Sequence, residues 1–248
     1  MITIKKPEDF ARMRRAGRVV ARIHEALREA AAPGVSLIEL DRIAATIIAD
    51  GGCTPNFLNY HGFPANTCLS VNEEIVHGIP SERTLKDGDI LSVDAGAIFE
   101  GWHADAAITF PIGEIADEAA QLIEVTERAM WVAIEMSTAG TRLGDIGVAI
   151  SEVAEKHGYG VVRSHTGHGI GLQMHEDPQV LNYGHPGKGL RLREGMGICI
   201  EPMFNLGTGE TRTLDDGWTV VTADGALSAH WEHTVAITAE GPEVLTLL

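Results

Sequence analysis

The amino-acid sequence predicts an α+β fold with two similar halves. Two amphipathic helical patterns are followed by strand-like stretches, and the same order then occurs a second time. No stretch of changed composition separates the halves, so we expect a single domain over residues 1–248.

The helices of the first half are predicted from apolar spacing and from the residues at their ends. Between Pro7 and Ala32 apolar residues recur every three or four positions, and Pro33-Gly34 ends the pattern. Ser36 and Glu39 form a capping box that begins a second helix, which is expected to end at Gly51-Gly52.

Strands complete the first half, and the second half repeats the order. Thr67–Val71, Ile90–Ile98 and Trp102–Phe110 have strand-like composition, and the last two are expected to pair across a turn at Glu100-Gly101. Two further helices and three short strands follow, at Asp117–Thr138, Leu143–His157, Gly197–Pro202, Trp218–Ala223 and His230–Thr238.

Charge and cysteine content restrict the partners and the compartment. The 19 Lys and Arg residues against 35 Asp and Glu give a formal charge of −16, which argues against binding to DNA or RNA through basic residues. Three cysteines without a C-x-x-C pair indicate a reduced, cytoplasmic setting. We expect no signal peptide and no membrane span, because the first residues lack an apolar region and the uncharged stretch Gly51–Asn72 is rich in Gly, Pro and Asn.

Two aspartates stand in apolar surroundings on the predicted hairpin. A tight turn would place Asp94 and Asp105 close to opposite each other, where two carboxylates repel unless a proton or a cation lies between them. The alternative is that one faces solvent and the other caps a loop. The hairpin alone leaves both possibilities open.

A group of histidines follows in the second half. His165, His168 and His175 lie close together in the sequence, and Gly167 and Gly169 allow the backbone to approach closely at His168. A single such histidine is more often structural, but the cluster favours a functional role.

Glu201 and Glu232 stand among apolar residues of two later strands, although Glu232 also fits an exposed position on an alternating strand. With Asp94, Asp105 and His168 they form an oxygen-rich set that suits two divalent ions better than one tetrahedral zinc ion. Two such ions activate water for attack on a carbonyl, and an adjacent acid or histidine moves the proton to the leaving amine. The residues therefore predict metal-assisted hydrolysis.

Six motifs in order make the sequence resemble the type I methionine aminopeptidase family along its whole length. They are Cys68–Pro80, Leu85–Asp94, Gly167–Gly171, His175–Val180, Ile200–Met203 and Trp231–Thr234. The resemblance implies the pita-bread fold, in which a curved antiparallel sheet carries helices on its outer face and a pseudo-twofold axis relates the halves.

The resemblance also implies a role for each candidate ligand. Asp94 would hold one metal ion, His168 and Glu201 would hold the other, and Asp105 and Glu232 would bridge them. Glu201 corresponds in addition to the family's proton shuttle. The two ions could be Co, Mn, Fe, Ni or Zn, because availability decides as much as affinity does.

Substrate-binding residues are implied in the same way. His175 would stabilise the tetrahedral oxyanion, and His77 would position the substrate beyond the scissile bond. An apolar pocket for the methionine side chain would be lined by Tyr60, Phe63, Cys68, Met174 and Trp218. Met174 stands where the family often has an aromatic residue.

The expected function is removal of the initiator methionine from nascent proteins when the second residue is small. Because Ile2 is bulky and branched, we expect the chain to keep its own Met1.

Other functions fit the sequence less well than this one. A thiol hydrolase would use Cys68 with His77 or His175, but a lining role for Cys68 is favoured. Proline-directed or creatine-cleaving relatives generally carry an extra N-terminal domain, for which no room is expected before Pro7, and type II methionine aminopeptidases carry a long insertion. A non-catalytic binding module is disfavoured because all five ligand positions are intact.

The expected partners are nascent polypeptide N-termini, and we expect a monomer. The first helix has a basic side that a ribosome could contact, although a solvated helix face is favoured. Its arginines are Arg12, Arg14, Arg15, Arg18 and Arg22.

Overall fold

The computed structural model describes residues 2–248, so Met1 and its predicted retention lie outside the described residues. Four helices are present in this range, at α1 Pro7–Ala30, α2 Leu37–Asp50, α3 Asp117–Met136 and α4 Leu143–His157, with a 3₁₀ turn at Tyr60–Gly62. The strands are β1 Thr54–Pro55, β2 Thr67–Val71, β3 Glu74–Val76, β4 Ile90–Phe99, β5 Trp102–Pro111, β6 Gly160–Val161, β7 Gly167–Gly169, β8 Glu176–Val180, β9 Gly197–Ile200, β10 Met203–Asn205, β11 Thr211–Thr213, β12 Val220–Thr222, β13 Ser228–His230, β14 Glu232–Thr238 and β15 Gly241–Val244.

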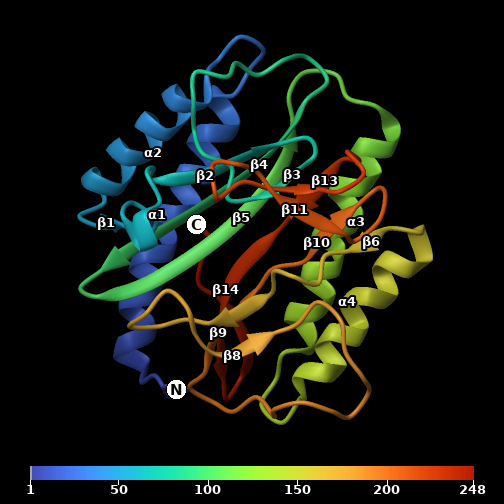
Figure 1. The fold of residues 1–248 in the computed structure, drawn as a ribbon. Helices are drawn as coiled ribbons and strands as arrows, with labels where there is room; N and C mark the ends of the chain where they lie inside the picture. The colour runs from blue at the N-terminus through green and yellow to red at the C-terminus, as the bar shows by residue number, and fades with distance from the viewer. Residues whose placement is uncertain (1) are drawn as a thin grey trace.

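One antiparallel sheet dominates the fold. Its strand order is β1-β4-β5-β14-β9-β7-β8, with β2 paired to β4 and β15 paired to β14. Two three-stranded sheets, β13-β10-β6 and β11-β12-β3, lie beside it. The sheet is curved, with α1 and α2 beside the β4–β5 half and α3 and α4 on the opposite side of the molecule (Figure 1). This is the predicted α+β architecture in two halves.

The helices cover one face of the sheet and leave the other face for a site. α1 packs against β4 and β5, and α3 packs against β5, β9 and β14. The main apolar core lies between these helices and the sheet, where Ile23, Leu91, Val93 and Ile198 are fully buried. Within residues 2–248, no helix is both long and apolar enough to cross a membrane.

The predicted elements agree with the structure except at some ends. The first helix ends at Ala30 rather than Ala32. Ala31 has an extended backbone, and Ala32 precedes Pro33, a position that disfavours the helical conformation. The third ends at Met136 rather than Thr138, where the Ser137 hydroxyl bonds to the carbonyl of Ala133.

All three of the later predicted strands are wrong in extent. Trp218 and Thr219 lie outside β12 because both donate their N–H groups to Asp216. His230–Thr238 is divided into β13 and β14, because the N–H of Trp231 bonds to the carbonyl of Pro202 instead of continuing one ladder. The predicted strand from Gly197 stops at Ile200, and several short strands, including β7 and β8, were not predicted.

The C-terminal segment packs tightly against α1 at Gly17. A Cβ atom at this position would overlap the carbonyl oxygen of Leu245. Leu245 is itself fully buried, and its N–H bonds to the carbonyl of Thr234 on β14. The glycine therefore lets the first helix and the end of the chain touch.

Gly17→Ala tests this contact. Alanine favours an exposed helix by up to about 1 kcal/mol over glycine, but overpacking against a buried backbone costs about 1–3 kcal/mol or more. We expect overpacking to win, so that urea unfolding gives a free energy of unfolding lower by about 2 kcal/mol. The control is Arg22→Ala on the exposed side of α1, which should change it by less than about 0.5 kcal/mol. An unchanged or raised value for Gly17→Ala would contradict the packing argument.

Candidate metal centre

Five neighbouring strands each bring one candidate ligand to the same region of the sheet. Asp94 lies on β4, Asp105 on β5, Glu232 on β14 and His168 on β7, while Glu201 directly follows β9. Residues far apart in the sequence thus become neighbours because their strands are paired.

The β4–β5 register explains how the two aspartates meet. The hairpin turns at Glu100 and Gly101, which both have positive φ, as a tight two-residue turn requires. Asp94 pairs with Ala107 and Asp105 with Gly96, so the carboxylates share a face but are offset by two residues rather than directly opposite. Ala107 also pairs with Glu232, and its small side chain leaves space above it for three carboxylates.

The glycines that flank His168 are needed for close backbone approach, as predicted. A Cβ at Gly167 would overlap the carbonyl oxygen of Cys199, and one at Gly169 would overlap that of Asp177. The Nδ1 atom of His168 lies 2.9 Å from the carbonyl oxygen of Gly169, which leaves Nε2 to face the carboxylates.

The carboxylates are buried without adequate partners. Asp105 and Glu232 are 3% and 2% exposed. One oxygen atom of each of Asp94, Asp105 and Glu232 is buried and has no hydrogen-bond partner among residues 2–248. Burial and mutual repulsion raise the pKa of Asp94 and Glu232 well above the ordinary values. Burial likewise raises the pKa of Asp105 to about 7.

The candidate ligands form two groups that share Glu232. In the first, one oxygen each from Asp94, Asp105 and Glu232 lie within 4.8 Å of one another. In the second, Nε2 of His168 lies 3.5 Å from Oε1 of Glu201 and 4.0 Å from Oε1 of Glu232. The thiol of Cys199 also lies in the second group, close to His168 and Glu232. Burial raises its pKa well above the ordinary value, so it is a protonated and poor ligand.

This donor set fits divalent cations. Unpaired buried carboxylates are costly, and a cation between them removes both the desolvation penalty and the repulsion. Burial lowers the pKa of His168 to about 3, so its imidazole is neutral and able to donate a lone pair.

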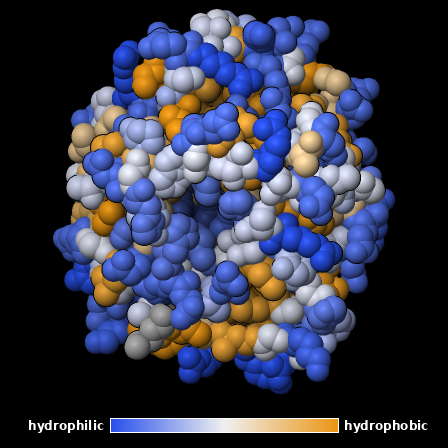
Figure 2. Space-filling view, viewed as in Figure 1, coloured by the Kyte–Doolittle hydropathy of each residue, from blue (hydrophilic) through white to orange (hydrophobic). Residues whose placement is uncertain are grey.

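All of the site residues predicted from the sequence line one cavity of about 110 Å³. They are Tyr60, Phe63, Cys68, His77, Asp94, Asp105, His168, Met174, His175, Glu201, Trp218 and Glu232. Figure 2 shows the surface hollowed near its centre, over β5, with mostly hydrophilic residues around the opening.

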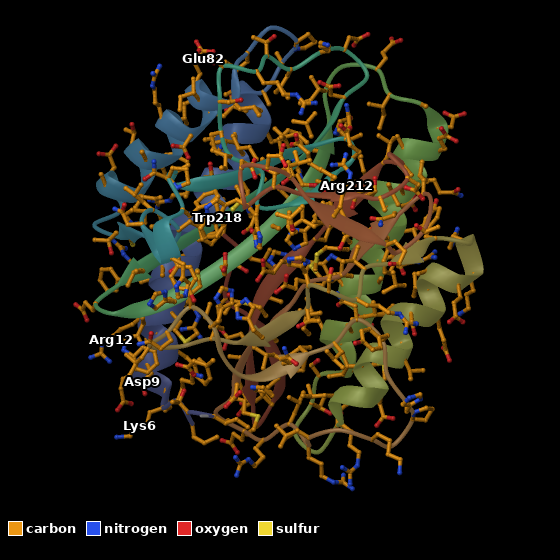
Figure 3. The ribbon with its side chains drawn as sticks, viewed as in Figure 1. Lys6, Asp9, Arg12, Glu82, Arg212 and Trp218 are labelled. Carbon is orange, nitrogen blue, oxygen red and sulfur yellow. The ribbon has the colours of Figure 1, made fainter. Side chains whose placement is uncertain are left out.

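One end of the cavity is apolar. Phe57, Phe63, Cys68 and Met174 form a buried cluster there, and the Trp218 ring, labelled in Figure 3, lies 5.2 Å from that of Phe63. A single water needs roughly 10–15 Å³ of such space, so the cavity admits one side chain of several heavy atoms.

Histidines line the wall beside the carboxylates. His77 has a positive φ of 61°, a conformation that non-glycine residues rarely adopt and that occurs at functional sites. Its ring lies 5.3 Å from that of His165 and 6.4 Å from that of Trp218. The Nδ1 atom of His175 lies 2.8 Å from the hydroxyl of Tyr60.

Four lining residues of the cavity were not predicted from the sequence as site residues. They are Phe57, Val76, His165 and His230. His230 is the most informative of them, because it is 1% exposed and neither ring nitrogen has a hydrogen-bond partner among residues 2–248. Its Nε2 atom lies 3.7 Å from Oε2 of Glu201. Its place two residues before Glu232 was a signal that could have identified it, since alternate residues of a strand share a face.

Comparison with known proteins agrees with this geometry. The profile of metallopeptidase family M24 matches residues 11–239. Methionine aminopeptidases of Clostridium acetobutylicum and Clostridium perfringens are 52% and 49% identical over 248 residues, covering this whole chain and 99% and 100% of the relatives.

Solved structures give the same result. The methionine aminopeptidase of Thermotoga maritima superposes with a TM-score of 0.99 at 42% identity, with all of both chains covered. The prolidase of Pyrococcus furiosus shares the fold at a TM-score of 0.81 and 23% identity, but only 65% of that chain is covered. The expected pita-bread fold is thereby confirmed. With a family match over most of its length and relatives at half identity from end to end, the chain belongs to metallopeptidase family M24, among the methionine aminopeptidases.

Proposed function

We propose that this chain removes the initiator methionine from nascent polypeptides whose second residue is small, by attack of a water activated between two divalent ions. The observation that carries the proposal is that the five candidate ligand side chains and the apolar pocket line the same cavity. The relatives at about 50% identity are named methionine aminopeptidases, whereas the prolidase likeness at 23% supports the fold alone.

The proposed metal assignment is the one that the family resemblance implies, and the sharing of Glu232 between the two groups of side chains supports it. Asp94 would hold one ion, His168 and Glu201 the other, and Asp105 and Glu232 would bridge them. When bound, the ions supply Lewis acidity, which lowers the pKa of water and polarises the peptide carbonyl. Mn, Fe, Co, Ni and Zn all remain compatible with four carboxylates and one imidazole.

His175 would stabilise the oxyanion, and its contacts support this role. Burial lowers its pKa, so the ring is neutral. When the Tyr60 hydroxyl donates to Nδ1, the ring proton resides on Nε2, which can then donate to the developing oxyanion. Tyr60 thus selects the tautomer that the role requires.

Glu201 would carry the proton to the leaving amine, and His230 would orient it. Oε1 of Glu201 faces His168, whereas Oε2 faces Nε2 of His230. The 3.7 Å between these atoms is longer than a hydrogen bond, so the neutral imidazole of His230 would have to move closer to Oε2 to donate to it and fix the carboxylate when a metal ion binds.

A cysteine mechanism is not supported. Burial and the nearby carboxylates raise the pKa of Cys68 well above its ordinary value, and the side chain is 4% exposed. A protonated, buried thiol is a poor nucleophile.

Nascent-chain delivery by a ribosome contact stays a prediction. Arg12 pairs with Glu100, Arg14 with Glu243, and Arg15 lies over the ring of Phe99. These contacts within the chain account for part of the basic side of α1.

Metal removal tests the chemistry. We expect a chelator to abolish cleavage of a Met-Ala-Ser peptide, because the carboxylates lose the cations that neutralise them, and divalent ions added back to the apo-protein to restore it. Thiol alkylation under native conditions is the control and should leave turnover unchanged. Full activity of metal-free protein would contradict the proposal.

The second residue of the substrate tests specificity. The His77 ring has the rings of His165 and Trp218 beside it, at 5.3 Å and 6.4 Å, so we expect little space there for a branched side chain beyond the scissile bond. We expect kcat/KM for Met-Ala-Ser to exceed that for Met-Ile-Thr by at least about tenfold. The same reasoning predicts that the intact mass of this protein includes Met1. Equal kcat/KM values for the two peptides would exclude this specificity.

His230 variants test the orientation of Glu201. His230→Phe should weaken Mn²⁺ binding to the apo-protein by about 10–100-fold in titration calorimetry, because the imidazole that would donate to the outer oxygen of Glu201 in the metal-bound site is removed. His230→Gln keeps a donor and serves as the matched control, with binding close to wild type. If both variants bind equally well, His230 only fills space.

A further inference from the structure

The N-terminal segment before α1 contacts the loop that carries His175. The Nζ atom of Lys5 lies 3.0 Å from Oε2 of Glu176, the residue that follows His175. The Thr3 hydroxyl donates to the same oxygen at 2.5 Å. The side chains of Lys5 and Glu176 are only 2% and 5% exposed, so this ion pair lies inside the protein.

The other oxygen of Glu176 closes the loop on itself. Oε1 accepts hydrogen bonds from the N–H groups of Leu172 at 2.9 Å and Gln173 at 3.3 Å. Lys5 packs so closely on Gly171 that a Cβ there would lie 2.5 Å from its Cε atom. The carboxylate therefore ties the start of the loop, its end and the N-terminal segment together.

The loop between these contacts carries two residues of the cavity. Met174 lies in the apolar end, and His175 stands beside His168 with ring centroids 4.3 Å apart. The backbone of both is held on one side by Glu176, while the Tyr60 hydroxyl holds the His175 ring on the other.

A purely stabilising role explains this pair poorly. Burial lowers the pKa of Lys5. Burial alone would raise the pKa of Glu176, but hydrogen bonds from Thr3 and Lys5 hold it below its ordinary value. A buried ion pair often stabilises no more than apolar residues of the same volume, whereas its directional bonds fix a geometry.

We propose that Lys5 and Glu176 are positioning residues for catalysis, which hold the 171–176 loop so that His175 meets the oxyanion. The inference rests on the proposed function, because it assigns to His175 a part in that reaction. It also assigns a role in the site to the first residues of the chain, which lie outside the cavity.

Kinetics of Lys5→Met and Glu176→Gln test the proposal, because both substitutions keep the volume and remove the charge. A displacement of about 1 Å in a catalytic group can cost up to about a hundredfold in rate, so we expect kcat on Met-Ala-Ser to fall by about 10–100-fold. KM should stay within about threefold, since an oxyanion contact forms only in the transition state. Arg12→Gln removes the exposed pair with Glu100 and is the matched control, with unchanged kcat.

A second measurement separates positioning from general damage. In a His175→Ala background, Lys5→Met should lower kcat little further, because the group that it positions is already missing. The proposal would be overturned if Lys5→Met lowered kcat by the same factor in the His175→Ala background as in wild type, or if the Lys5→Met single variant had a wild-type kcat. Should Lys5→Met fail to fold, Thr3→Val removes one hydrogen bond at constant volume and should lower kcat in the same direction by a few-fold.

Hydrogen exchange tests the loop without any assay of turnover. The amides of Leu172 and Gln173 should exchange faster in Lys5→Met than in wild type, and those of α4 should not change. Unaltered exchange at both amides would overturn the proposal even if the wild-type protein cleaves the peptide. If wild type fails to cleave while exchange increases, the proposed function fails and the contact between the N-terminal segment and the loop stands.

Discussion

The burial of four carboxylates on one face of a β-sheet is the constraint on which the rest of the structure depends. Asp105 and Glu232 are buried and Asp94 and Glu201 are partly buried, and within residues 2–248 no lysine or arginine side chain forms an ion pair with any of the four. Such a group is stable only with cations or protons. Of the formal charge of −16, these four account for −4, which two divalent ions would offset. The remaining acid excess has no comparable role.

The architecture can be understood from this requirement. Five neighbouring strands bring the candidate ligands together: Asp94, Asp105, His168 and Glu232 lie within paired strands, and Glu201 directly follows β9. Ala107, which pairs with both Asp94 and Glu232, keeps the surface between these two carboxylates free of bulk. The helices occupy the opposite face, where the apolar core holds the sheet rigid. His77 and His175, the residues proposed to meet the substrate, come by contrast from irregular segments.

Local sequence signals predicted much of the site and left out what depends on distant pairing. Asp94 and Asp105 were recognisable because a carboxylate in an apolar strand is unusual and a two-residue turn fixes their pairing. His168 was recognisable from its glycines. The offset of the aspartates and the break at Trp231 depend on contacts between strands, which periodicity does not report. The pair of Lys5 with Glu176 joins residues 171 positions apart, and no local pattern marks either one.

The position of β14 has a consequence for the order in which the protein matures during synthesis. The first half of the chain supplies only Asp94 and Asp105, whereas Glu232 lies on β14, which pairs with both β5 and β9. Domains emerge from the ribosome N-terminus first, so the site stays incomplete until the last long strand has been made and paired. A growing copy cannot act on its own first residue. Processing of any nascent chain therefore needs a copy of the protein that has already been completed and folded.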